Sequence, residues 1–134
     1  MKTLNWKLII GLSMIGLVIA LATTYGVITM NVERFVWLGV LLLNSFLVAK
    51  FCTGKYFLNG LFVSLANCVW ITGIHILLMD TYISHNPDYL EMLSQMPMPT
   101  RPRVMGMIMG PIVGLVFGIV QGLLALGFAK LMKK

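Results

Sequence analysis

The sequence predicts an all-α, polytopic membrane protein: an antiparallel bundle of four transmembrane helices with a short amphipathic helix in the outer loop between the third and fourth spans. Three observations lead to this fold class. Of the 134 residues, 59% are hydrophobic and 10% are charged, whereas a soluble domain carries roughly 25% charged residues. The mean hydropathy is +0.93. The apolar residues also gather in long runs between short charged segments, so residues 1–134 are interpreted as a single transmembrane domain.

Three charge-free runs are long enough to cross a bilayer, which takes about 20 helical residues. Residues 8–30, 56–79 and 104–129 supply 23, 24 and 26 uncharged residues. The first run continues past Ala20 and Ala22, so we expect it to be a span and not a cleaved signal peptide.

The remaining apolar run is shorter, with only 15 uncharged residues between Arg34 and Lys50. We predict a span over residues 34–50 that depends on local thinning of the bilayer and on snorkelling of both flanking cations. No Asp, Glu, Lys or Arg is then expected inside any span. This absence weighs against proton-coupled transporters and ion pumps.

The distribution of charge favours four spans and sets their orientation. One side then collects every lysine and no acidic residue, namely Lys2, Lys7, Lys50, Lys55, Lys130, Lys133 and Lys134. The other side collects Glu33, Arg34, Asp80, Asp88, Glu91, Arg101 and Arg103. The positive-inside rule predicts that the N- and C-termini are cytoplasmic. Because the basic residues form no continuous stripe, nucleic acid is not predicted as a partner.

The outer loop, residues 80–103, is the one connection long enough to carry its own structure. Asn86 and Pro87 suit the N-cap and first turn of a helix, and Asp88 suits its positive end. An apolar side follows, made of Tyr89, Leu90, Met92, Leu93 and Met96. We therefore predict a short amphipathic helix lying on the outer surface. Three prolines should end it and lead into the last span: Pro97, Pro99 and Pro102.

The most specific pattern is a row of glycines spaced four apart in the last span: Gly106, Gly110, Gly114, Gly118 and Gly122. Such spacing makes a shallow groove that lets another helix approach closely. The third span carries a matching small-residue face with Gly60, Ser64 and Cys68. We predict that these residues pack helices within one bundle. The alternatives are an oligomerisation face or the wall of a pore.

Four polar side chains are predicted to lie inside the spans: Asn44, Asn67, His75 and Gln121. Side-chain amides in hydrocarbon need partners, so we interpret the three amides as hydrogen-bonding groups between helices. The alternative is a polar path for a solute. His75, with His85 and the loop carboxylates, has the chemistry of a metal site but no established ligand spacing, so no metal or cofactor is predicted.

The second half of the chain resembles a family of small bacterial four-span membrane proteins of unknown function. The resemblance covers residues 55–134 and rests on three features: Phe57, Gly60 and Ser64 at the start of the third span, the run Asn86, Pro87, Asp88, Tyr89 and Leu90 in the loop, and the glycine-rich last span ending in Lys133 and Lys134. It implies a location in the bacterial inner membrane and supplies no activity.

Three functions are compatible with these observations. The first is a helix-packing or interaction subunit that assembles with itself or with another membrane protein. The second is a passive channel or small-solute transporter with a polar path through Asn67, Asn44 and Gln121. The third is a metal-binding protein at the outer interface. An enzyme is not favoured, because no nucleophile with an adjacent base, phosphate loop or carboxylate pair is found in the sequence.

Overall fold

The computed structural model describes residues 4–97 and 100–132, and these residues form helices and no strands. The helices are α1 (Trp6–Thr24), α2 (Met30–Phe51), α3 (Tyr56–Leu77), α4 (Met79–His85), α5 (Pro87–Ser94) and α6 (Pro102–Leu131). Four of them, α1, α2, α3 and α6, are long and apolar enough to cross a membrane. The all-helical class is thus confirmed, and the four helices are candidate spans that correspond to the four predicted ones, as in a multi-pass membrane protein. Pro99, Lys2, Lys133 and Lys134 lie outside the described residues.

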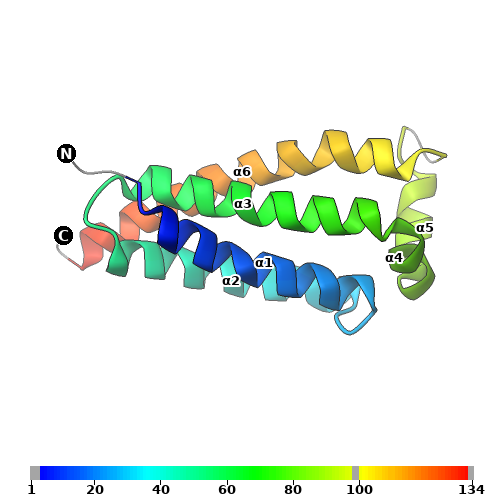
Figure 1. Ribbon diagram of the computed structural model, residues 1–134, viewed down its shortest axis with the longest axis horizontal. Helices are drawn as coiled ribbons and strands as arrows, with labels where there is room; N and C mark the ends of the chain where they lie inside the picture. Colours follow the sequence, from blue (N-terminus) through cyan, green and yellow to red (C-terminus); the bar gives the residue numbers. More distant parts are fainter. Residues whose placement is uncertain (1–3, 98–99, 133–134) are drawn as a thin grey trace.

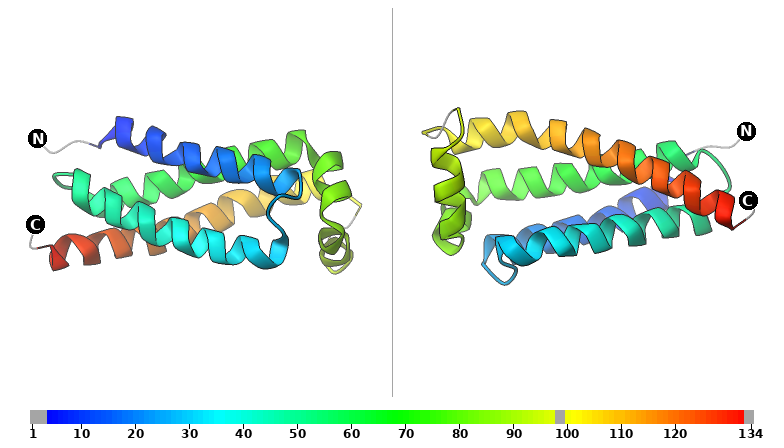
Figure 2. Two further views of the ribbon diagram at one scale, coloured as in Figure 1. Left: turned by 90° about the horizontal axis from the view of Figure 1, so that it is seen from below. Right: turned by 180° about the vertical axis from the view of Figure 1, so that it is seen from behind.

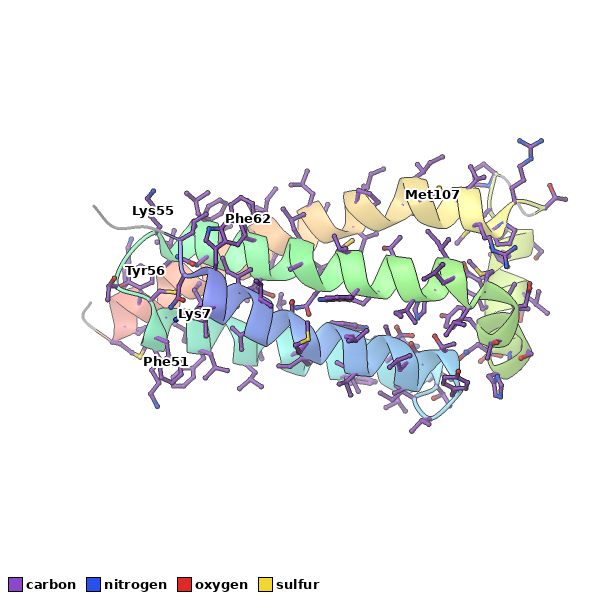
Figure 3. The ribbon with its side chains drawn as sticks, viewed as in Figure 1. Lys7, Phe51, Lys55, Tyr56, Phe62 and Met107 are labelled. Carbon is purple, nitrogen blue, oxygen red and sulfur yellow. The ribbon has the colours of Figure 1, made fainter. Side chains whose placement is uncertain are left out.

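The four long helices lie side by side, with α4 and α5 across one end (Figure 1). We call this end the loop end; it also holds the connection between α1 and α2. The opposite end holds both ends of the chain and the connection between α2 and α3, and Lys7 and Lys55 lie there (Figure 3). We call it the lysine end.

The helices pack closely at the lysine end and separate toward the loop end. The most extensive contact joins α3 to α6, followed by α1 with α3 and α2 with α6. α2 and α6 lie close together at the lysine end and diverge toward the loop end (Figure 2, right). The buried hydrophobic cluster lies in the converging half and consists of Ile9, Leu12, Val48, Cys52, Val63 and Ala125.

α1 ends six residues before the predicted boundary at residue 30. The Gly26 amide donates to the Thr23 carbonyl (3.2 Å), and the Val27 amide donates to the Ala22 carbonyl (2.9 Å). Gly26 has a φ of 74°, the left-handed conformation that glycine adopts most easily at a helix C-terminus. These two hydrogen bonds form a Schellman motif, which terminates the helix although the following residues are apolar.

α2 is longer than the predicted span, with 22 residues from Met30 to Phe51. It therefore has the length to cross the hydrocarbon without the thinning that we expected. Glu33 and Arg34 lie inside its first turns, and the prediction that no charge lies within a membrane span stays a prediction. Both side chains bond within the helix: Trp37 Nε1 donates to Glu33 Oε1 (3.2 Å) and Arg34 Nη2 donates to Asn31 Oδ1 (3.1 Å). Such local bonds let the helix start in a charged segment.

The outer loop contains the predicted helix, here α5, and a second helix, α4, that was not predicted. Asn86 does not cap α5 through its side chain. Its Nδ2 donates instead to the carbonyls of Thr23 (2.8 Å) and Tyr82 (2.9 Å), which fixes α4 against the end of α1. Leu93 is buried, whereas Leu90 is 52% exposed. The apolar side of α5 is therefore covered only in part. α6 starts at Pro102, a favoured first helical position.

Candidate functional site

The glycine row of α6 lies against α3 within the same chain. A Cβ atom built at Gly114 would lie 2.6 Å from Cys68 Cβ, and one built at Gly122 would lie 2.7 Å from the Phe57 carbonyl oxygen. Gly110 lies against Thr72, Gly118 against Leu61 and Gly106 more loosely against Ile76. A Cβ at Gly60 would lie 2.9 Å from Gly122 Cα. The glycines thus let two helix backbones approach closely, and α3 occupies the groove.

Polar side chains along this contact bond to the backbone of the neighbouring helix. Ser64 Oγ donates to the Gly114 carbonyl (3.2 Å) and Cys68 Sγ to the Gly110 carbonyl (2.8 Å). Gln121 Nε2 donates to the Gly60 carbonyl (2.9 Å) from the opposite direction. Each of these bonds joins α3 and α6, so this part of the site is a packed scaffold.

The two buried asparagines differ in their partners. Asn67 Oδ1 accepts the Gly16 amide of α1 (3.0 Å), although that amide is inside a helix. Asn44 is 0% exposed, and neither its Nδ2 nor its Oδ1 has a hydrogen-bond partner in the part of the chain that the structure describes. The structure therefore does not join Asn67, Asn44 and Gln121 into one hydrogen-bonded path.

A cleft of about 640 Å³ lies between α2, α3 and α6, where these helices diverge. The wall on α3 carries the polar side chains Ser64, Asn67, Cys68, Thr72 and His75 together with Ile71 and Ile76. The facing walls on α2 and α6 are mainly apolar and include Leu38, Val40, Leu41, Met109, Val113 and Phe117. Toward the lysine end the lining stops at Gln121, and the buried hydrophobic cluster begins beyond it. Asn44 does not line this cleft.

Aromatic residues and one carboxylate surround the cleft at the loop end. Its lining there includes Glu33 and Trp37 of α2, His75 of α3, Tyr82 of α4 and Tyr89 of α5, a group that we call the aromatic mouth. The rings of His75 and Tyr82 stack with centroids 4.2 Å apart, and those of Tyr82 and Tyr89 meet edge to face at 4.8 Å. Burial raises the pKa of the Tyr82 phenol, and the Glu33 carboxylate and Tyr89 raise it further.

The ring of His75 has a defined orientation. Its Nε2 lies 2.9 Å from Thr23 Oγ1, which also lies 3.0 Å from the Ala20 carbonyl oxygen. The contact holds the ring beside α1, and which of the two atoms donates depends on the tautomer of His75. Among the described residues, no three His, Cys, Asp or Glu side chains lie close enough together to hold a metal ion.

Sequence reasoning identified Asn67 and His75 as polar residues inside a span but missed Glu33, Trp37, Tyr82 and Tyr89 as parts of one site. The spacing of Glu33 and Trp37, four residues apart, is the local signal for one pair on a helix face. The two tyrosines join them only through the positions of α4 and α5. Comparison of the chain with protein-family models, curated proteins and solved structures gave no match, so the resemblance to a bacterial four-span family stays a prediction.

Proposed function

We propose that the protein is a membrane-embedded binding protein whose cleft between α2, α3 and α6 holds an amphiphilic molecule taken from the bilayer. The observation that carries this proposal is the polarity of the cleft. Its apolar walls are formed by membrane-spanning helices, and its polar and charged groups lie on α3 and at the loop end. A lipid-like molecule has the same arrangement, with an apolar tail and a polar head.

The size of the cleft favours a small molecule over a helix of a partner protein. Ligand sites commonly measure roughly 300–1,000 Å³, and this cleft measures about 640 Å³. A helix with its side chains is about 10 Å across, so a spanning length of it occupies more space than the cleft encloses. A spanning helix passes through about 30 Å of hydrocarbon. The cleft therefore fits a chain-like amphiphile and not a second transmembrane helix.

The other sequence-based functions have weaker support. The interaction-subunit interpretation started from the glycine row, and α3 already fills that groove. Assembly with itself or with another membrane protein thus stays a prediction without a contact that argues for it. The channel interpretation needs a path through Asn44, which lies outside the lining of the cleft.

The amphiphile would enter from the outer leaflet if the bundle has the orientation that we propose. In this arrangement the four spans are antiparallel, the lysine end and both termini are cytoplasmic, and the chain lies in the bacterial inner membrane. The support is the gathering of the lysines at one end and the positive-inside rule. Reporter fusions after Lys55 should read cytoplasmic and a fusion at Gln95 external. A cytoplasmic reading at Gln95 would contradict the orientation.

Filling the cleft tests the proposed function directly. Val113 lines the cleft and is 45% exposed, whereas Val116 lies on the same helix outside it and is 56% exposed. We expect wild-type protein purified in mild detergent to retain an extractable amphiphile that mass spectrometry identifies. Val113→Trp should lose this molecule, and Val116→Trp should retain it. Equal retention in both variants, or none in the wild type, would refute the proposal.

A further inference from the structure

Glu33 lies at the edge of an apolar cleft, and among the described residues no cationic side chain pairs with its carboxylate. Its side chain accepts a hydrogen bond from Trp37 Nε1, a neutral donor. The ion pair found among the described residues joins Arg103 to Asp80 and does not involve Glu33. Charges at such positions normally have a partner of opposite sign, because a partly desolvated charge is costly alone. Glu33 lies in the first turn of α2, where the helix dipole favours a carboxylate, and no cationic side chain among the described residues pairs with it.

Arg34 does not supply this partner, although it also borders the cleft. Adjacent residues on a helix point about 100° apart. The Arg34 guanidinium donates to Asn31 Oδ1 (3.1 Å) and lies 6.0 Å from the centre of the Phe35 ring. Its charge is thus directed away from Glu33.

The groups around Glu33 are aromatic and come from four different helices. Trp37, His75, Tyr82 and Tyr89 all line the cleft beside it. Their contacts hold them in place: His75 stacks on Tyr82, Tyr89 meets Tyr82 edge to face, and Thr23 fixes His75. Aromatic faces around a carboxylate attract organic cations, above all ammonium groups with alkyl substituents, since these are weakly hydrated.

We propose that the aromatic mouth binds the ammonium head of an alkylammonium amphiphile, with Glu33 as its counter-charge and Trp37, Tyr82 and Tyr89 as its aromatic walls. This inference rests on the proposed function, because it names the head group of the molecule whose tail occupies the cleft. Asn67 and His75 lie further along the wall on α3. Asn67 Nδ2 supplies a donor, and His75 Nδ1 supplies a second polar atom, for polar groups that link head and tail.

The test is calorimetric titration in dodecyl maltoside micelles with three probes that share one tail: dodecyltrimethylammonium, dodecyl sulfate and dodecanol. We expect wild-type protein to bind the ammonium probe about tenfold or more tightly than the other two. Glu33→Gln, which keeps the size and the acceptor for Trp37, should remove this preference. Asp88→Asn changes an exposed carboxylate of α5 outside the cleft and should keep it.

The outcomes separate this inference from the proposed function. If Val113→Trp loses all three probes but wild-type protein shows no preference for the ammonium head, the inference fails and the cleft still binds tails. If Val113→Trp binds all three as the wild type does, the proposed function fails. If dodecyl sulfate binds more tightly than dodecyltrimethylammonium, the inference is overturned, and Arg34, not Glu33, selects the head group. If tetramethylammonium binds as tightly as dodecyltrimethylammonium, the ligand is a soluble cation and the proposal of an amphiphile is overturned.

Discussion

The lysine-end half and the loop-end half of the bundle use small and polar residues in opposite ways. In the lysine-end half, Gly60 and Gly122 bring α3 and α6 to backbone contact, and Gln121 bonds across them. In the loop-end half α6 stays against α3 at Gly110, beside Thr72, and the contact loosens only at Gly106, where a built Cβ would lie 3.7 Å from Ile76. There the polar side chains of α3 line a cleft. The difference assigns close packing to one half and the proposed binding cleft to the other.

The largest effect on this comparison should come from the glycine contact nearest the lysine end. Gly122→Leu adds a side chain whose Cβ would lie only 2.7 Å from the Phe57 carbonyl oxygen. We expect a loss of about 3 kcal/mol or more in the free energy of unfolding, because backbone cannot move aside as a flexible side chain can.

Gly127→Leu is the matched control, since nothing lies within 4 Å of a Cβ built at that position of α6. It should leave the free energy of unfolding unchanged or raise it by about 0.8 kcal/mol through helix propensity. Denaturation in mixed micelles gives both values. Equal losses for Gly122→Leu and Gly127→Leu would show that close packing of α6 on α3 does not hold the bundle together.

The two buried asparagines should respond in opposite directions to the same substitution. Asn67→Leu removes the bond to the Gly16 amide and should destabilise the bundle by about 1 to 2 kcal/mol. Asn44→Leu removes two polar atoms that lack partners among the described residues and should stabilise it by about 1 kcal/mol. Thermal unfolding in detergent distinguishes the two signs. Destabilisation by Asn44→Leu would mean that this amide has a partner, such as a bound water.

The loop end should lose stability at alkaline pH. Burial raises the pKa values of the Tyr82 and Tyr89 phenols above the ordinary value of about 10. The folded state therefore favours the neutral phenols. Their contribution to the stability of the fold is fully present below about pH 10 and is lost as the pH rises through the folded-state pKa values.

The measurement is the melting temperature of the protein between about pH 9 and pH 11, a range set by the ordinary phenol pKa. We expect it to fall more in the wild type than in the variant with Tyr82→Phe and Tyr89→Phe. Tyr25→Phe, at a tyrosine that is 54% exposed, serves as the control and should melt as the wild type does. Identical alkaline losses in all three proteins would rule out the buried phenols as the cause.

The smallest effect should come from the ion pair at the loop end. Arg103 Nη2 lies 3.3 Å from Asp80 Oδ2, and the two side chains are 50% and 92% exposed. Exposed pairs contribute little, so we expect Asp80→Asn to change the free energy of unfolding by at most about 0.5 kcal/mol at low salt and less at high salt. A loss comparable to that of Asn67→Leu would show that this pair anchors α4 and α5.

The sequence was sufficient for features that depend on composition and on periodicity along one helix. Hydropathy located four spans, and the spacing of the α6 glycines indicated a helix groove. Two boundaries were wrong for local reasons. Gly26 ends α1 inside an apolar run, and α2 begins before the charged pair Glu33 and Arg34. Both errors arose because the boundaries were set by counting charge-free residues and not by helix-terminating signals.

The cleft could not be predicted in the same way, because it depends on the angles between helices. Its polar side chains on α3 were found singly, with Ser64 on the small-residue face and Asn67 and His75 among the polar residues inside the spans. The aromatic mouth draws Glu33, Tyr82 and Tyr89 from α2, α4 and α5. No spacing along the chain relates these residues. They come together because Asn86 fixes α4 against the end of α1 and thereby places α4 and α5 over the cleft.

Replacing one valine by tryptophan in each half of the bundle tests most directly whether the lysine-end half is packed and the loop-end half is open. Val63 is 0% exposed in the cluster at the lysine end, and Val113 lines the cleft. We predict that Val63→Trp prevents recovery of folded protein, because overpacking a filled core is destabilising. Val113→Trp should melt within a few degrees of the wild type, since its ring enters open space. A loss of folded protein for Val113→Trp as severe as that for Val63→Trp would contradict the division into a packed half and an open cleft.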